Sequence, residues 1–387
     1  MRDPEQYKEH GRNDPLSPEQ RREHPYDFVS LPEQPAPGQA VGHDRFFADR
    51  LTGRLTLVYE TLTPLHVGSG VLETAAQCGL AGGATPVRGI VRKLGQPVLP
   101  GSGWKGVVRA RFEAITRSRL GQRSRGGRVE SWKLPEELRP TGGGGGRPEV
   151  TFTDDRVTGA LDPKMVSRGR DSDDEVRARL RDLSPAEAVF GAMGYRGRVH
   201  PSDGVVAGPA AGEPLPVPPL EGPAAHRLAK PGAAKRTSEG RVEISQVEGR
   251  KFYYDGPLLH SRARQGDEDW KPAQELIDSV PAGCSITIEI QVESLTEAEL
   301  GALLVSAGWG EGAGIVRFGG FKPAGLGKVR LAEVTGEVHR GHSTSRWRRP
   351  PGEAVDPARA VDTSRREGLI DDGALAELHD VTTRLRP

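Results

Sequence analysis

A glycine-rich stretch, LPGSGWKGVVRAR at residues 99–111, carries the clearest chemical pattern in this chain of 387 residues. Gly101, Gly103 and Gly106 form G-x-G-x-x-G between a short apolar run and a predicted helix, which is the layout of a dinucleotide-binding turn. A turn of this kind directs the free amides of a helix N-terminus toward a phosphate group. That phosphate could belong to a nucleotide cofactor or to a nucleic-acid backbone, and the pattern could also bind nothing.

Positive charge follows this turn. Residues 104–133 contain nine Lys or Arg residues and two acids. Lys105 and Arg109 share a helix face because they are four residues apart. A dinucleotide site needs an acidic residue about 20 positions beyond the glycines to hold the ribose, whereas the corresponding stretch, LGQRSRGGRVE, is mostly basic. The segment therefore predicts that Lys105, Arg109 and Arg111 contact a phosphate backbone, with a solvated basic helix face as the alternative.

A second glycine-rich segment, GGFKPAGLGKV, lies near the end of the predicted body. Glycine allows the backbone to approach a ligand closely, and lysines beside it supply positive charge. A hairpin turn rich in glycine is the ordinary alternative. The segment adds these candidate RNA-binding residues: Gly319, Gly320, Lys322, Gly325, Gly327 and Lys328.

Composition limits the classes of protein that this chain can belong to. The hydrophobic fraction is 35%, and 51 glycines and 32 prolines imply that much of the chain is loop. The net charge of +1 argues neither for nor against nucleic acid. Cys78 and Cys284 lie far apart without histidines at ligand spacing, which argues against a disulfide scaffold and a zinc site. No secretory signal or apolar run of membrane-spanning length is visible, so we expect a cytoplasmic protein with no membrane partner.

The order of the predicted elements indicates an α+β fold. A helix with a capping box, Thr296 and Glu299, follows the clearest strand. The sequence of strand, helix, two strands, helix and strand is the ferredoxin-like βαββαβ pattern. The predicted elements are strands at 54–68, 195–206, 285–295 and 328–338 and helices at 104–116 and 296–308.

The remaining segments define a domain plan around this core. Residues 1–45 are predicted to be a polar N-terminal extension, within which residues 25–33 dock as an extended arm. The body covers residues 46–337. Long insertions interrupt it at about 121–185 and 207–280. Residues 338–387 are predicted to be a flexible tail.

Four segments, taken in order, resemble the RAMP superfamily of CRISPR-associated proteins, and within it the backbone subunits of type III effector complexes. They are TPLHVGSG, LPGSGWKGVVRARF, VFGAMGYRGRVHPSDG and GGFKPAGLGKVRL. The resemblance implies a ferredoxin-like core, similar to the RNA-recognition fold, that binds guide RNA (crRNA) and helps to hold target RNA in antiviral defence. It also implies head-to-tail packing with other CRISPR effector subunits, and it adds Arg196 and Arg198 to the expected RNA contacts.

The resemblance also bears on catalysis. In active members of the family, an Asp in the loop between the first strand and the first helix promotes cleavage of target RNA. Aligning ATPV with the family pattern places Ala84 at that position, so we expect no cleavage there and no cofactor. The first alternative is an RNA endonuclease that uses Mg²⁺ with Glu73, Asp154 or Asp155. The other is a nucleotide-cofactor enzyme that uses the GSGWKG turn.

Four further polar side chains have simpler interpretations. His66 ends a predicted strand and Asp203 lies in a turn, so a structural role is expected for both. Tyr253 and Tyr254 could stack on bases or fill a core.

Overall fold

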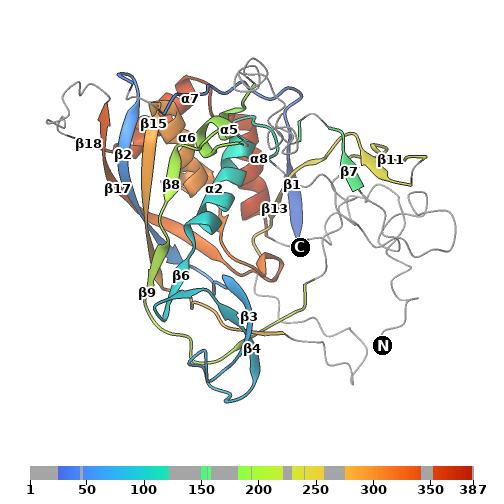
Figure 1. Ribbon diagram of the computed structural model, residues 1–387, viewed down its shortest axis with the longest axis vertical. Helices are drawn as coiled ribbons and strands as arrows, with labels where there is room; N and C mark the ends of the chain where they lie inside the picture. Colours follow the sequence, from blue (N-terminus) through green and yellow to red (C-terminus); the bar gives the residue numbers. More distant parts are fainter. Residues whose placement is uncertain are drawn as a thin grey trace.

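A large antiparallel sheet with helices against one face forms the centre of the molecule (Figure 1). The strands run in the order β16, β17, β2, β15, β9, β6 and β5, while β8 pairs with β15 and β18 with β17. The computed structural model describes residues 25–43, 47–121, 150–154, 156–157, 182–192, 194–220, 229–238, 240–256, 275–340 and 352–385. The strands of this sheet are β2 (Leu51–Thr61), β5 (Arg92–Lys93), β6 (Gln96–Leu99), β8 (Val199–Pro201), β9 (Gly204–Ala207), β15 (Ser285–Leu295), β16 (Val316–Arg317), β17 (Lys328–Arg340) and β18 (Glu353–Ala354).

Alternation along the central strands separates a buried face from a solvent face. In β15, Ile286, Ile288 and Ile290 are buried, whereas the residues between them are exposed or partly exposed. The buried face packs against α2 (Gly101–Ile115) and α6 (Glu297–Ala307). The helix α6 begins with the predicted capping box, because Thr296 and Glu299 each accept from the other's backbone amide. The predicted α+β class is confirmed.

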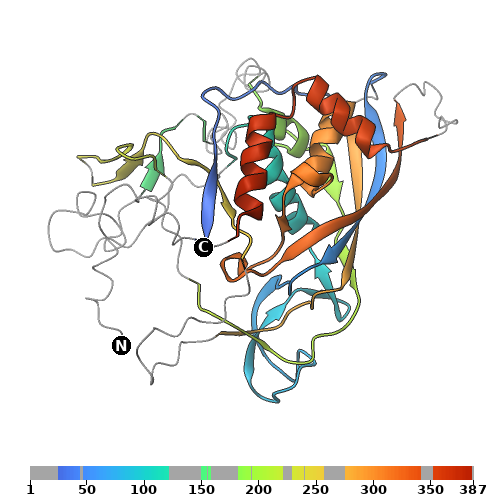
Figure 2. The same cartoon turned by 180° about the vertical axis from the view of Figure 1, so that it is seen from behind.

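Three smaller sheets lie beside this core in the described residues, and two of them have more than two strands (Figure 2). One has four strands in the order β10, β14, β4 and β3, and the other has three in the order β11, β12 and β7. Strands β7, β10, β11, β12 and β14 come from the described parts of the two predicted insertions. The bounds are β3 (Gly68–Thr74), β4 (Pro86–Ile90), β7 (Val150–Phe152), β10 (Leu215–Val217), β11 (Ala234–Arg236), β12 (Val242–Ile244) and β14 (Glu275–Ile277), with a short helix α5 (Pro185–Phe190) and 3₁₀ turns η5 (Glu311–Ala313) and η6 (Lys322–Ala324).

The segment expected to dock as an arm forms a strand. β1 (Tyr26–Ser30) pairs antiparallel with β13 (Gly249–Tyr253), and its Val29 is fully buried. The amide and hydroxyl of Ser30 donate to the carboxylate of Glu377 on the last helix. These contacts join the N-terminal segment to the C-terminal one.

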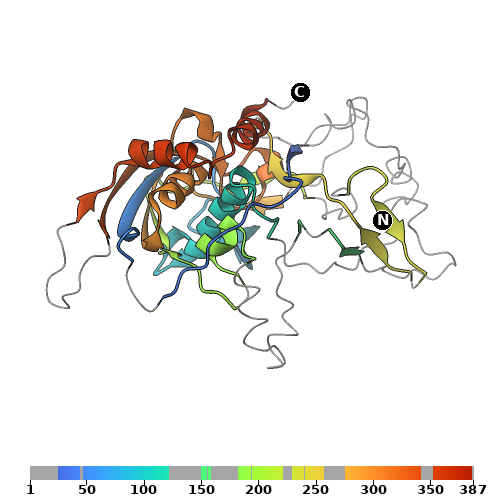
Figure 3. The same ribbon diagram turned by 90° about the horizontal axis from the view of Figure 1, so that it is seen from above.

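The prediction of a flexible tail at 338–387 is wrong for residues 352–385. These form β18, α7 (Pro357–Arg366) and α8 (Asp372–Thr383), which pack onto the helical layer (Figure 3). The carbonyl of Ala360 comes so close to Gly301 in α6 that a Cβ there would lie 2.0 Å from it. Small residues make this contact, and α7 therefore lacks the strong apolar stripe by which a packed helix is recognised in a sequence. In the part of the chain that the structure describes, no helix is both long and apolar enough to cross a bilayer.

Candidate nucleic-acid interface

The G-x-G-x-x-G turn forms the first two turns of α2. Strand β6, which precedes it, pairs antiparallel with β9 and does not form a parallel βαβ unit. Asp203 caps the helix, because its Oδ1 accepts from the amide of Gly101 at 3.0 Å. The carbonyl of Ser202 also lies 2.5 Å from where a Cβ of Gly101 would be. The chain itself therefore occupies the amide and the Cβ space of Gly101, an arrangement that does not favour the dinucleotide-cofactor alternative and that agrees with a structural role for Asp203.

One face of α2 nevertheless remains bare beyond this cap. Gly103 and Gly106 lie one turn apart and are exposed, with open space around the Cβ position of Gly106. Lys105 directly precedes Gly106, and Arg109 lies about one turn beyond it on the same helix. The ammonium of Lys105 donates to the carbonyl of Val199 at 2.8 Å, and no carboxylate among the described residues pairs with it. Burial, followed by the charge of Arg109, lowers the pKa of Lys105.

The guanidinium of Arg109 is held by its own helix and by α5. It donates to Glu113 Oε1 at 2.8 Å and to the carbonyl of Gly191 at 2.9 Å. Arg250 on β13 also forms an ion pair with Glu113, so that carboxylate joins α2 to the two-stranded sheet of β1 and β13. Arg109 is therefore positioned at the surface but already partly neutralised.

Arg111 does not contact the surface at all. Its side chain is 2% exposed, and it donates to the carbonyls of Ser306 at 2.8 Å and Ile315 at 3.0 Å, and also to that of Ala313. These carbonyls belong to the end of α6 and the turn after it. Arg111 thus satisfies buried backbone acceptors that would otherwise have no partner. The prediction that Arg111 contacts RNA is corrected to a structural role.

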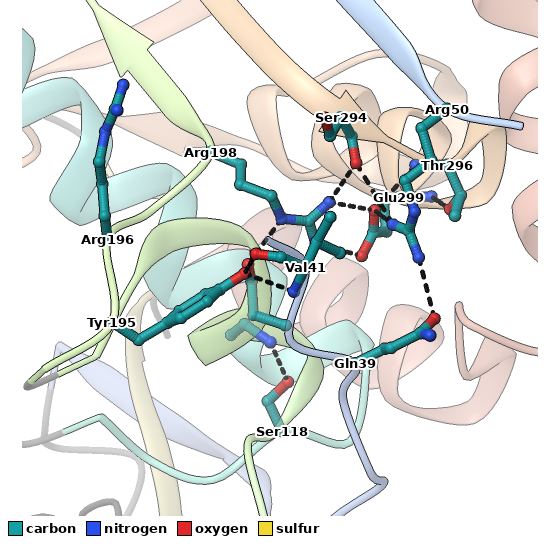
Figure 4. A network of polar contacts seen from close by, with 12 residues as sticks. Gln39, Val41, Arg50, Ser118, Tyr195, Arg196, Arg198, Ser294, Thr296 and Glu299 are labelled. Carbon is teal, nitrogen blue, oxygen red and sulfur yellow. Dashed lines mark hydrogen bonds and ion pairs between the residues drawn. The ribbon is translucent and has the colours of Figure 1, made fainter. Parts of the chain in front are cut away.

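Arg198 is corrected in the same way (Figure 4). It is fully buried, and its Nη2 and Nη1 lie 2.5 and 2.8 Å from the two carboxylate oxygens of Glu299. It also donates to the carbonyls of Ser294 at 2.6 Å and Ala188 at 2.9 Å. Because Glu299 also caps α6, Arg198 connects that helix to α5 and β15 instead of meeting a ligand.

Arg196, two residues earlier, faces solvent and points away from this network (Figure 4). Its side chain is 59% exposed, and it pairs with Glu293 at 2.9 Å. His200 lies 3.5 Å from the same guanidinium, and Lys105 is near enough to affect the pKa of His200. The structure therefore brings together Lys105 and Arg196, two of the predicted phosphate contacts, around His200.

The second glycine-rich segment folds as a compact loop against the end of β2. Gly319, Gly325 and Gly327 have φ values of 72°, 86° and 79°, in the left-handed region that favours glycine. A Cβ on Gly319 would lie 2.3 Å from the carbonyl of His66, and the amide of Gly320 donates to that same carbonyl at 2.8 Å. Glycine is thus required here by the loop's own packing, which agrees with the turn alternative and leaves close approach of a ligand as a prediction.

The two lysines of this loop differ in their surroundings. Lys328 pairs with Asp255 Oδ2 at 2.8 Å, and Arg317 pairs with the other oxygen at 2.8 Å. The ammonium of Lys322 has no hydrogen-bond or acidic partner within the described ranges. Burial, followed by the nearby charge of Arg317, lowers the pKa of Lys322 to about 8. A partly buried ammonium without a counter-charge is a position that an anion would stabilise.

The candidate acids do not form a catalytic constellation. Asp154 accepts from the amide and guanidinium of Arg156 and from the amide of Val247 at 2.8 Å. Burial opposes its ionisation, but these hydrogen bonds outweigh that effect and lower its pKa. This arrangement favours a structural role, and Asp155 lies outside the described residues. Over the described ranges, no three His, Cys, Asp or Glu side chains are grouped so that they could hold a metal ion.

The loop expected to carry the family's catalytic Asp contains an exposed Ala84 just before β4. Glu73 lies on β3, where its Oε2 accepts from the thiol of Cys78 at 3.7 Å. A Cβ on Gly89 would clash with the same oxygen, so Glu73 lies over the backbone of β4. Burial, and then the charges of Asp278 and Glu73, raise the pKa of Cys78 to about 11, so this thiol is not a nucleophile near neutral pH.

Two other side chains have structural surroundings. His66 is 4% exposed, and its Nδ1 lies 2.8 Å from the carbonyl of Asp278 and therefore donates to it. Its ring packs edge-on against Phe321 at 5.3 Å, and burial lowers its pKa. Tyr254 is buried with its hydroxyl 3.2 Å from Asp27, whereas Tyr253 is only partly buried on β13.

The glycine-rich segments lie within a match to a known family. A family model of the RAMP superfamily matches residues 58–330, which is well over half of the chain. The chain belongs to the RAMP superfamily. The resemblance found in the four motif segments of this RAMP protein is thereby confirmed at the level of the superfamily.

Two solved structures similar to this RAMP protein have informative titles. One is a chain of "Type IV-B CRISPR Complex", with 17% identity, a TM-score of 0.31 and coverage of 77% of this chain and 95% of that chain. The other is from "Cryo-EM structure of the Type III-B Cmr-beta bound to cognate target RNA", with 11% identity, a TM-score of 0.33 and coverage of 76% and 62%. No curated protein matches the chain. Because both TM-scores are low, the family assignment depends on the family-model match.

Three acids of this RAMP protein determine which cations are free, and their pairing with those cations was not predicted from the sequence. Asp255 neutralises Lys328, Glu293 pairs with Arg196, and Glu299 pairs with Arg198. Of the three acids, only Glu299 could be singled out from the sequence, because it occupies the capping-box position of α6. Asp255 and Glu293 are far in sequence from their partners, and no local pattern connects them.

Proposed function

We propose that this RAMP protein is a backbone subunit of a type III CRISPR effector complex that grips the phosphates of guide RNA and helps to hold target RNA. In this proposal it packs head to tail with other CRISPR effector subunits in a cytoplasmic ribonucleoprotein. Membership of the superfamily and the resemblance of the motif segments to CRISPR-associated RAMP proteins support it. The observation that carries it is Lys322, an ammonium without a counter-charge among the described residues, held in a glycine-rich loop.

A ferredoxin-like core is part of this proposal. The strands β17, β2, β15 and then β8 with β9 lie side by side and are antiparallel throughout. Along the chain they alternate with α2 and α6 as strand, helix, strand, strand, helix, strand. Both helices pack on the same buried face. This order and layering are what a βαββαβ core would have.

The proposed phosphate contacts are of two kinds. Lys322 would gain a counter-charge, and its depressed pKa would return toward the ordinary value of 10.5 when a phosphate binds. The bare face of α2 at Gly103 and Gly106 would let a sugar–phosphate chain approach the helix backbone, with Lys105 beside it. Contacts of this kind fix the position of an RNA and leave sequence recognition to base pairing.

We also propose that the subunit does not cleave RNA at the family's usual position. Ala84 has no group that could bind a metal ion or take a proton. Glu73 is engaged with Cys78, and Asp154 accepts hydrogen bonds on both oxygens, so neither is free for that task. Mg²⁺ would therefore be needed only if an acid outside these positions acted.

The test uses the full chain purified from its native host and as a recombinant protein. The native particle should contain RNA, and the recombinant protein should bind single-stranded RNA with an affinity that falls steeply with salt. Lys322→Gln should weaken binding several-fold and reduce the slope of log affinity against log salt by about 0.7. Lys235→Gln, which removes an exposed lysine paired with Glu243, is the matched control. An RNA-free native particle, or equal salt slopes for wild type and Lys322→Gln, would overturn the proposal.

A further inference from the structure

Four segments that are distant in sequence bring a group of polar side chains to one place on the surface, here called the His43–His200 cluster. Arg196 Nη2 lies 2.9 and 3.0 Å from the two carboxylate oxygens of Glu293. His200 Nε2 lies 3.6 Å and His43 Nδ1 4.0 Å from one of these oxygens. Lys105 reaches the cluster from α2 and donates to the carbonyl next to His200. The side chains of both histidines are about one-quarter to one-third exposed.

The charges in this cluster do not balance. Two permanent cations, Lys105 and Arg196, face a single carboxylate within the described residues, that of Glu293. Three further neighbours are uncharged: Gln291 donates to Glu293 at 3.3 Å, the ring of Tyr195 lies 5.5 Å from that of His43, and His43 Nε2 lies 3.1 Å from the carbonyl of Arg196. Protonation of either imidazole adds a further positive charge. A half-exposed site with surplus positive charge and several donors is suited to an anion.

We propose that the His43–His200 cluster binds a phosphodiester of single-stranded RNA, and that its two histidines make this contact stronger as the pH falls. The proposal rests on the proposed function, because it assigns a second phosphate contact to an RNA-binding subunit. A phosphate presents a pair of oxygens much as the carboxylate of Glu293 does, so the guanidinium of Arg196 can donate to either group. His43 and His200 then supply additional donors once they carry a proton.

The direction of the pH effect follows from the surroundings of His200. Burial lowers the pKa of His200, Glu293 raises it, and the charges of Lys105 and Arg196 lower it again, with a net lowering. His200 is therefore neutral near pH 7 in the RNA-free protein. A bound phosphate adds negative charge and favours the protonated form, so RNA binding takes up protons. By linkage, acidification must then strengthen RNA binding.

The first experiment measures anisotropy of a fluorescein-labelled single-stranded oligouridine RNA with the full chain at about pH 7.5 and about pH 5.5. Wild type should gain about tenfold in affinity on acidification, the effect of roughly one charge-assisted hydrogen bond. The double variant His43→Gln/His200→Gln should show little of this gain. His339→Gln, which replaces another histidine beside a glutamate on β17, should behave as wild type. A gain that persists in the double variant would overturn the proposal.

The second experiment tests for an increase in RNA affinity, which a misfolded variant would not show. Glu293→Gln removes the carboxylate that competes with phosphate for Arg196, so RNA affinity at about pH 7.5 should rise several-fold. Glu289→Gln makes the same change of charge four residues earlier on the exposed face of β15 and should have a much smaller effect. Equal effects of the two variants would mean that only the overall charge matters and would overturn the proposal. Absence of RNA binding by wild type at both pH values would instead overturn the proposed function.

Discussion

Arg198 allows a direct test of whether a buried arginine in a basic motif is structural. Replacing it with Met keeps most of the side-chain volume but leaves the carboxylate of Glu299 without its closest partner. Breaking a buried pair from one side costs about 3–5 kcal/mol of the free energy of unfolding. Arg50 remains 3.4 Å from Glu299, which favours the lower end of that range.

The assay is urea denaturation followed by tryptophan fluorescence, with Arg196→Met as the matched control. At an m-value of about 3 kcal/mol/M, the Arg198→Met variant should unfold at a urea concentration about 1 M lower than wild type. Arg196 is 59% exposed, so its replacement should change the free energy of unfolding by less than about 1 kcal/mol. RNA affinity measured well below either transition should fall for Arg196→Met more than for Arg198→Met.

The opposite pattern would refute the reasoning. If Arg198→Met kept the wild-type midpoint and lost RNA binding, then Arg198 would have to reach RNA, and the buried arrangement with Glu299 would not represent the working protein. A loss of stability together with unchanged RNA affinity per folded molecule supports the structural role.

Three further predictions concern glycine, lysine and the loop of Ala84. Gly106→Ala should raise the free energy of unfolding by about 0.5–1 kcal/mol in urea, because open space surrounds its Cβ position; a loss of stability would contradict this. For Lys322, the folded-state pKa of about 8 lies below the ordinary value of 10.5. Between these two pH values, Lys322 is therefore protonated in the unfolded chain but largely neutral in the folded protein. The stability of wild type relative to Lys322→Met should therefore rise between about pH 8 and about pH 10.5, as thermal melts of both proteins across this window would show. Purified complexes incubated with Mg²⁺ should leave target RNA intact on denaturing gels, and cleavage that vanished in Glu73→Ala would show that the chain is an enzyme.

The parts of the fold that could be predicted from sequence are those set by local patterns. The strict alternation in β15 and the capping box of α6 are both local, and both appear as expected. Helix α7 was missed because it buries small residues such as Ala360 and Thr363, which leave no apolar stripe in the sequence. Packing of small residues is decided by the shape of the partner, here Gly301, and the sequence of one helix does not show that shape.

In the candidate site, the backbone conformation of the glycines could be predicted from the sequence, whereas the pairing of its charged side chains could not. Gly319, Gly325 and Gly327 adopt left-handed conformations, a requirement that belongs to each residue alone and is therefore visible in the sequence. Whether a cation is free depends instead on acids that the fold brings to it, as Asp255 comes to Lys328.

The contrast is sharpest in the motif RGRV, where Arg196 and Arg198 lie two residues apart. An intervening glycine sits so close to the backbone of Phe190 that a Cβ would lie 2.3 Å from its carbonyl, which fixes the path of the chain between them. The outcome is that Arg196 remains 59% exposed while Arg198 is fully buried. The spacing of charges in a motif therefore cannot by itself assign ligand contacts. What separates the two roles is the position of an acid about 100 residues away, Glu293 at the surface or Glu299 in the core.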